Sequence, residues 1–320
     1  MNDLNILFLS FGLNEKQKFV VSSMKSVFEM NGHAVNYLDF AYFEDGSVMS
    51  GHLSRPVISN SCAVKLFEDL QSEKYNLIIC LDSVACKVAC AVTKRCDFKT
   101  LVFMLQTDYS FPREYLSLDA DAFFLTSGLF LDDYESKIDK EKLFTYLTPA
   151  LIADNKPFLD FDYCVVFSDM LENDEVSALA EALSKICFTV VVAKADYRYI
   201  RDKLSCSKQI KVFPELCFDI SNCKAVISTP YSIYSAVAVS KKLPLILMNH
   251  SSAYKPEELN CMEKLGLGIG CCGIKEAADA LDAIMNDSMT LACIRLNLQK
   301  YHSSISCTDV CKTIMDFYNK

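Results

Sequence analysis

The sequence predicts an α/β fold with two Rossmann-like domains that face a cleft. Three observations support this prediction. Short apolar runs rich in β-branched and aromatic residues alternate with segments of helical periodicity. The alternation pauses once, in a stretch that carries two prolines, and then starts again. The chain of 320 residues is too long for one small core and fits two domains of ordinary size.

The first half of the chain contains six apolar runs of strand length. They are Asn5–Ser10, Ala34–Asp39, Asn76–Leu81, Thr100–Leu105, Ala122–Ser127 and Leu143–Thr148. The segment after the first run, EKQKFVVSSMKSVFEMNG, has helical spacing and ends in Asn31 and Gly32, as a helix stop does. Because continuous apolar strands separated by helices are typical of parallel sheets covered on both faces, we expect such a sheet here.

The aperiodic stretch Thr148–Asp162 predicts the linker between two domains, at residues 1–150 and 151–320. The strand-like runs after it are Tyr163–Ser168, Phe188–Ala193, Gln209–Phe213, Lys224–Ser228 and Pro244–Met248. Helical patterns dominate from Glu257 onward and are interrupted at GLGIGCCG. Ligands of such sheets bind outside the carboxyl ends of the strands, so we expect the functional residues in the loops that follow them.

Composition and charge exclude several classes of protein. Hydrophobic residues make up 51% of the chain and charged residues 23%, which is typical of a well-buried globular protein. The net charge of −9 argues against a nucleic-acid partner. The sequence shows no segment typical of export or of a membrane span, so we expect a cytoplasmic protein. Lys16, Lys18 and Lys25 are compatible with a basic membrane-binding patch on an early helix, although an ordinary solvated helix face is the preferred interpretation.

The sixteen cysteines are interpreted as buried free thiols rather than as a disulfide framework. They are scattered through apolar segments, and no CxxC pair occurs among them. A zinc site usually needs tighter ligand pairs and histidine, and the chain has only four histidines. We therefore predict neither a metal site nor a cofactor.

One segment carries a family resemblance, LQTDYSFPREYLSLDADAFFLTS. A strand ends in Thr107 and Asp108, an aspartate (Asp119 or Asp121) precedes the next strand, and that strand ends in Thr126 and Ser127. This order resembles the diacylglycerol glycosyltransferases, which include monogalactosyldiacylglycerol synthase and are close in fold to MurG-type enzymes. The resemblance spans nearly the whole chain, as spacing and strand content more than as identities, so the chain looks like a divergent member.

The resemblance implies a GT-B fold with an acceptor-side first domain and a nucleotide-sugar-side second domain. It also implies a metal-independent, inverting glycosyltransferase that moves a sugar from a nucleotide donor, in this family a UDP-sugar, to a lipid or envelope-precursor hydroxyl. Its partners would then be the nucleotide-sugar and a lipid or membrane-surface acceptor. Such a protein would be cytoplasmic and peripheral at the inner membrane face.

The catalytic residues that the resemblance implies depart from the family pattern. The family has a glycine-histidine pair after its first strand, where this chain has Asn14 and Glu15. Glu15 can replace the histidine as general base if burial raises its pKa, although a first-turn carboxylate that complements the helix dipole is the preferred alternative. Asp108 would position the acceptor or the base.

The donor motif departs further. The family sequence K-P-G-G corresponds to Thr229–Ser232, and the family glutamate that receives sugar or ribose hydroxyls corresponds to Val237, which cannot accept a hydrogen bond. Tyr231 replaces a glycine that lets backbone amides approach a pyrophosphate, whereas Ser232 and the helix start can still meet an anion. The donor-binding residues implied here are Ser168, Lys194, Thr229, Tyr231, Ser232, Val237, Tyr254 and Lys255.

These departures leave three hypotheses open. The first is an active glycosyltransferase with an altered donor site. The second is a catalytically inactive protein of the same fold, with a binding or regulatory role, that has lost the donor motif. The third and weakest is a sugar-nucleotide epimerase of the same architecture. Binding of a nucleotide or nucleotide-sugar discriminates between the first two.

Overall fold

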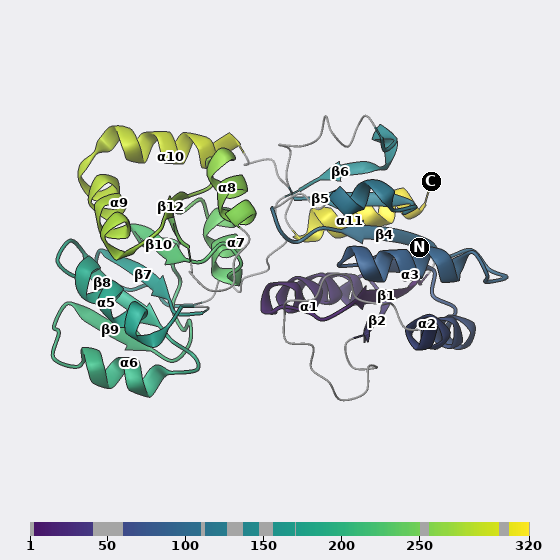
Figure 1. Ribbon diagram of the computed structural model, residues 1–320, viewed down its shortest axis with the longest axis horizontal. Coiled ribbons are helices and arrows are strands. Elements are labelled where there is room, and N and C mark those ends of the chain that lie inside the picture. The colour runs from purple at the N-terminus through teal and green to yellow at the C-terminus, as the bar shows by residue number, and fades with distance from the viewer. Residues whose placement is uncertain are drawn as a thin grey trace. The chain divides into compact units, whose positions relative to one another are not determined.

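The protein is described by a computed structural model that covers residues 3–40, 60–109, 113–126, 137–146, 156–169, 171–249, 256–300 and 307–319. The chain divides into two compact units (Figure 1). Unit 1 comprises Met1–Leu151 together with Ser304–Lys320, and unit 2 comprises Ile152–Ser303. Each unit has its own parallel sheet, so the predicted two-sheet α/β class is confirmed.

The sheet of unit 1 has the strand order β2-β1-β3-β4-β5-β6, and every described pair is parallel. Its strands are β1 (Asn5–Ser10), β2 (Ala34–Asp39), β3 (Leu77–Cys80), β4 (Leu101–Leu105), β5 (Ala122–Leu125) and β6 (Leu143–Thr145). Its helices are α1 (Glu15–Met30), α2 (Asn60–Glu73), α3 (Ser83–Thr93) and α11 (Cys307–Tyr318), with the 3-10 turns η2 (Arg113–Ser117) and η3 (Lys140–Lys142). The first two strands have the bounds that the sequence predicts.

Helices cover both faces of this sheet. Alternate residues of β1 point to opposite faces: Leu7 and Leu9 lie in the core formed with α2 and α3, whereas Ile6 and Phe8 lie in the core formed with α1 and α11. This two-sided burial explains why the strands are apolar without interruption.

Helix α11 belongs to unit 1, although it is the last helix of the chain (Figure 1, yellow). The domain division expected from the sequence, at residues 1–150 and 151–320, places this helix in the second domain instead. Its buried residues recur every three or four positions, which gives one apolar face that packs beside α1. The Phe317 ring meets Phe103 of β4 and Phe144 of β6 edge to face, with centroids 5.3 and 5.6 Å away.

The sheet of unit 2 has the strand order β12-β11-β10-β7-β8-β9, and its described pairs are also parallel. Its strands are β7 (Tyr163–Phe167), β8 (Phe188–Val192), β9 (Ile210–Phe213), β10 (Ala225–Ser228), β11 (Leu245–Met248) and β12 (Ile269–Cys271). Its helices are α5 (Asn173–Leu183), α6 (Tyr197–Leu204), α7 (Ile233–Ser240), α8 (Pro256–Lys264), α9 (Ile274–Asn286) and α10 (Ser288–Lys300).

Strand β12 is the element that the sequence argument missed, because it lies inside the segment GLGIGCCG. Glycines weaken the pattern of a strand, but here they allow close packing. A Cβ atom on Gly268 would lie 2.9 Å from the Leu247 side chain and 3.0 Å from the Leu245 carbonyl oxygen. The residue that leads into β12 can therefore lie this close to β11 because it has no side chain.

Two expectations about composition are settled by the structure. The cysteines are free thiols, as predicted, and most of them are buried. The solvated face expected for Lys16, Lys18 and Lys25 is wrong for Lys16, which is 2% exposed. Lys16 is buried because its ammonium group reaches an aspartate at the end of β4. Among the helices that the structure describes, none is long and apolar enough to cross a membrane.

Candidate functional site

The candidate donor site lies at the carboxyl edge of the unit 2 sheet. Because β10 pairs with β7 and β7 pairs with β8, the loops after these three parallel strands are neighbours. Ser168 and Asp169 follow β7, Lys194 follows β8, and Thr229 follows β10. The topology therefore places four polar residues at the edge where the sequence predicts the donor site.

Helix α7 begins at this edge. Ser232 is its N-cap, and the Ser232 hydroxyl accepts a hydrogen bond of 3.0 Å from the Tyr234 amide. In the turn that precedes α7, the Ser232 amide donates a hydrogen bond of 3.1 Å to the Thr229 carbonyl oxygen. The Ser235 hydroxyl donates to the same oxygen. The Ser235 amide bonds the Ser232 carbonyl oxygen at 3.2 Å, which leaves the Ile233 amide, among the described first-turn amides, to meet a negative charge at the start of α7.

An internal carboxylate already lies at the start of α7. Asp169 accepts a hydrogen bond from the Ser232 side chain, while burial raises the pKa of the Asp169 carboxyl above its ordinary value. Its Oδ1 atom is buried without a hydrogen-bond partner among the described residues, and so are the hydroxyl oxygens of Ser228 and Thr229. Buried polar atoms are usually paired, so these three atoms are candidates for hydrogen bonds with a ligand or with water.

The other predicted donor residues have different environments. Val237 is 3% exposed and lies on the buried, apolar face of α7. Tyr231 is half-buried and Lys194 is exposed. Tyr254 and Lys255 lie outside the described residues. The neighbouring Tyr234 ring stacks on Phe167, with ring centroids 3.7 Å apart, which fixes α7 against β7.

In unit 1, the turn between β1 and α1 is held by two carboxylates. Asp39 accepts hydrogen bonds from the amides of Gly12 at 2.7 Å and Leu13 at 3.3 Å, and Asp82 accepts one from Phe11 at 2.6 Å. Gly12 has a φ of 84°, which a side chain would strain. Burial raises the pKa of the Asp82 carboxyl, while its backbone hydrogen bonds oppose this effect. The amides of this turn are therefore used inside the unit.

Asp108 follows the carboxyl end of β4, which is separated from β1 by β3 in the sheet order. Its carboxylate lies 3.3 Å from the Lys16 ammonium group, whose side chain is 1% exposed, while the Asp108 side chain is 29% exposed. The same ammonium lies 5.2 Å from the centre of the Tyr109 ring. The Thr126 hydroxyl also donates to the Asp108 carbonyl oxygen. Asp108 is thus fixed in place with part of its carboxylate open to solvent.

Glu15 is the first residue of α1 and pairs with Lys18 at 2.7 Å. Its side chain is 82% exposed, so unit 1 does not provide the burial that the sequence argument required of a general base. The first turn of α1 is instead organised by a capping box, in which Asn14 and Gln17 bond each other's backbone amides at 2.8 and 3.1 Å. Its catalytic role stays a prediction.

Sequence reasoning missed two residues of these edges. Asp169 comes two residues after the buried strand β7. A carboxylate at the carboxyl end of a parallel strand is a recognisable candidate for a site residue. Lys16 gave a misleading signal, because a lysine in the first turn of an amphipathic helix is usually solvated. Only the position of α1 above the end of β4 explains its burial.

Comparison with solved structures identifies the architecture. The calicheamicin glycosyltransferase CalG4 matches at a TM-score of 0.72 with 11% identity, over 100% of this chain and 99% of that chain. MurG of Acinetobacter baumannii matches at 0.69 with 10% identity, over 98% and 99%. The glycosyltransferase VinC, solved in complex with dTDP, matches at 0.65 with 9% identity, over 99% and 100%. No protein-family model and no curated protein matches the sequence.

The chain therefore has the GT-B fold, the two-sheet α/β architecture of these glycosyltransferases. Within that class, identities of this size show the fold alone and leave the donor and the acceptor to be inferred from the residues of the site.

Proposed function

We propose that the protein is a glycosyltransferase that moves a sugar from a nucleotide donor, a UDP-sugar, to a lipid or envelope-precursor hydroxyl. The observation that carries this proposal is the start of α7, where buried hydroxyls and a buried carboxylate oxygen have no partner among the described residues. A helix start is a ready site for a diphosphate. The complex of VinC with dTDP, a nucleoside diphosphate, supports this ligand class for the fold.

In this proposal, the donor diphosphate lies against the first turn of α7. The Ser232 hydroxyl would donate to a diphosphate oxygen in place of Asp169, the Ile233 amide would donate to another, and Ser228 and Thr229 supply the neighbouring hydroxyls. Stabilising the departing diphosphate lowers the barrier to sugar transfer, because negative charge builds up there in the transition state. Since Val237 is buried and apolar, the donor hydroxyls need acceptors elsewhere, and Ser168 at the end of β7 is a candidate.

In this proposal, the charge of the Asp169 carboxylate affects the affinity for the donor diphosphate. This carboxylate is bonded to Ser232, the residue that would contact the diphosphate. A bound diphosphate and an ionised Asp169 would repel each other, whereas a protonated Asp169 could donate a hydrogen bond to a phosphate oxygen. The raised pKa of Asp169 makes protonation easier than for an exposed aspartate.

On the acceptor side, we propose that Asp108 positions the acceptor hydroxyl and that Glu15 takes up its proton. Lys16 holds Asp108 by its ion pair, so that the open part of the carboxylate has a fixed direction. The exposure of Glu15 allows proton exchange with solvent. Membrane attachment at the inner face belongs to this proposal as a consequence of a lipid acceptor.

Calorimetric titration with UDP, UDP-glucose, UDP-galactose and UDP-N-acetylglucosamine tests the donor site. The informative variant is Ser232→Gly, because glycine at an N-cap costs only a few tenths of a kcal/mol of helix stability. The matched control is Ser240→Gly at the other end of α7, where the hydroxyl donates to the Val237 carbonyl oxygen at 2.8 Å. We expect at least fivefold weaker binding for the first variant alone. Absence of binding by every nucleotide would favour the inactive alternative.

A further inference from the structure

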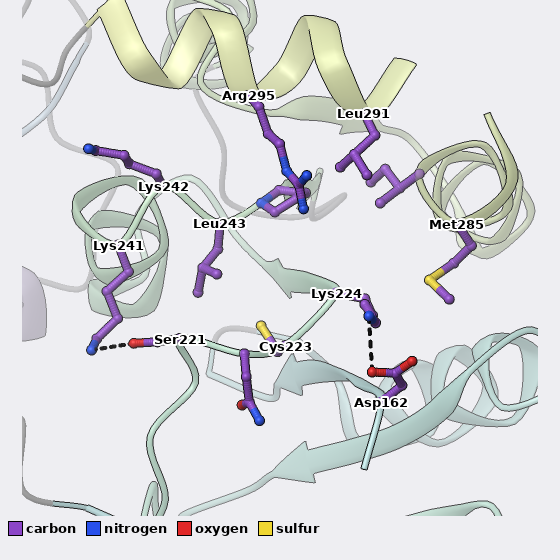
Figure 2. Close-up of a pocket in the computed structure, with 13 residues that line it drawn as sticks. Asp162, Ser221, Cys223, Lys224, Lys241, Lys242, Leu243, Met285, Leu291 and Arg295 are labelled. Atoms are coloured by element: carbon purple, nitrogen blue, oxygen red, sulfur yellow. Dashed lines mark hydrogen bonds and ion pairs between the residues drawn. The ribbon is translucent and has the colours of Figure 1, made fainter. Parts of the chain in front are cut away.

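Unit 2 has a polar cavity at the edge of its sheet opposite the start of α7. The cavity has a volume of about 550 Å³, within the range of small-molecule sites. Its walls come from the residues that precede β7, β10 and β11 and from α9 and α10. Four cationic side chains line it: Lys224, Lys241, Lys242 and Arg295 (Figure 2).

Two of the four cations form ion pairs with aspartates near the cavity. Lys224 pairs with Asp162 at 2.9 Å, and Lys241 pairs with Asp219 at 3.2 Å. Burial alone would raise the pKa of the Asp219 carboxyl, but hydrogen bonds from Ser221 and the Lys241 ammonium group outweigh it and lower the pKa. These two pairs leave the cavity with an excess of positive charge from the remaining two cations.

Helix electrostatics explains some of this charge. Lys241 and Lys242 directly follow α7, where cations complement the C-terminal end of a helix. The helix dipole does not explain Arg295, because Arg295 lies inside α10 rather than at its C-terminal end. Among the described residues, no acidic side chain pairs with Arg295 or Lys242. Figure 2 shows the Arg295 side chain extending from α10 into the space between Leu243 and Lys224.

The wall beside Arg295 is apolar. Leu243, Met285 and Leu291 line the same cavity and surround the space into which Arg295 extends (Figure 2). A guanidinium group binds phosphate through two parallel hydrogen bonds, and the apolar side chains offer contact to an organic group attached to it. Positive charge in this one place is unusual for a chain of net charge −9.

We propose that this cavity is a second ligand site, which binds an organic phosphate through Arg295 and Lys242, with the organic part against Leu243, Met285 and Leu291. The phosphate can belong to a soluble metabolite or to a phospholipid headgroup, which present the same chemistry. The site lies away from the start of α7, so it goes beyond the proposed donor site and does not depend on it.

Calorimetric titration of the full chain with inorganic phosphate and with phenyl phosphate tests the site. Phenyl phosphate should bind more tightly, because its ring contacts the apolar wall. Arg295→Gln should weaken phenyl phosphate binding about tenfold or more, without lowering the Tm of the ligand-free protein, because Arg295 is exposed. The matched control is Arg201→Gln, an exposed arginine of α6 that pairs with Asp202 and lies outside the cavity.

Sedimentation with phosphatidylglycerol and phosphatidylcholine vesicles distinguishes the two sources of phosphate. Binding to phosphatidylglycerol vesicles that is lost in Arg295→Gln, and kept in Arg201→Gln, assigns the phosphate to a lipid. Binding of phenyl phosphate without vesicle binding assigns it to a soluble compound. The proposal is overturned if neither probe binds or if both variants lose binding equally. UDP titration of Ser232→Gly is a separate measurement, so failure of the donor site would be recognised independently.

Discussion

Replacing Asp169 by asparagine should strengthen binding of UDP. The substitution keeps the shape of the side chain but removes the negative charge next to Ser232. Two unit charges about 6 Å apart at an effective dielectric constant of about 20 repel by about 2.8 kcal/mol. Solvent screening lowers this repulsion, so we expect a gain of about 1–2.5 kcal/mol, or about 5- to 70-fold in Kd, since 1.4 kcal/mol is tenfold.

The assay is calorimetric titration with UDP between pH 5.5 and 8. For the unmodified protein, affinity should rise as the pH falls toward the raised pKa of Asp169, and the Asp169→Asn variant should show a smaller rise. The control is Asp202→Asn, which removes an exposed carboxylate of α6. If UDP binds to the unmodified protein and Asp169→Asn binds it equally or more weakly, the electrostatic reasoning is wrong.

The same carboxyl also sets a pH dependence of stability. A carboxyl with a raised folded pKa binds its proton more tightly in the folded state. The free energy of unfolding therefore falls as the pH rises from the unfolded pKa through the folded pKa. Asp169→Asn should remove this contribution, which chemical denaturation at pH 4.5 and pH 8 would detect as a smaller difference between the two values.

Three further predictions concern unit 1. Lys16→Met should cost about 1–3 kcal/mol in unfolding free energy, because Asp108 loses its buried partner, and adding Asp108→Asn should recover part of that loss. Asn14→Ala should cost about 1 kcal/mol by removing the capping box, measured by urea denaturation. Phe317→Ala should cost about 2–4 kcal/mol, because its ring contacts β4 and β6.

Each of these has an outcome that contradicts it. Full additivity of Lys16→Met and Asp108→Asn would show that the ion pair is not coupled energetically. An unchanged midpoint for Asn14→Ala would mean that water replaces the cap at no cost. A cost below about 0.5 kcal/mol for Phe317→Ala, the usual range of surface substitutions, would contradict the packing of α11 on the sheet of unit 1.

The strands could be predicted from the sequence because a strand buried on both faces is apolar throughout, as in Tyr163–Phe167 and Leu245–Met248. Strand β12 could not, because Gly268 packs against β11 and Gly270 packs against Glu263 of α8, contacts that the sequence does not display. The unit to which α11 belongs depends on packing between segments about 290 residues apart, such as the Cys311 thiol near the Met24 carbonyl oxygen. No local pattern encodes such a contact.

The place of the candidate site stays a prediction from topology, and its chemistry does not follow from the local sequence. The carboxyl edge of the sheet follows from topology, and Ser232 at the start of α7 follows from a recognisable N-cap. The roles of Asp169 and Lys16 depend on burial, which changes what a charged side chain can do. Burial comes from the whole unit rather than from neighbouring residues in the sequence.

The aspartates that hold the β1–α1 turn have a consequence for selectivity. Asp39 and Asp82 consume the amides of this turn, which in other α/β proteins are available to a phosphate. An approaching anion would find acceptors instead of donors and would be repelled. This turn of unit 1 is therefore suited to a ligand that presents a hydroxyl or another neutral donor rather than an anion.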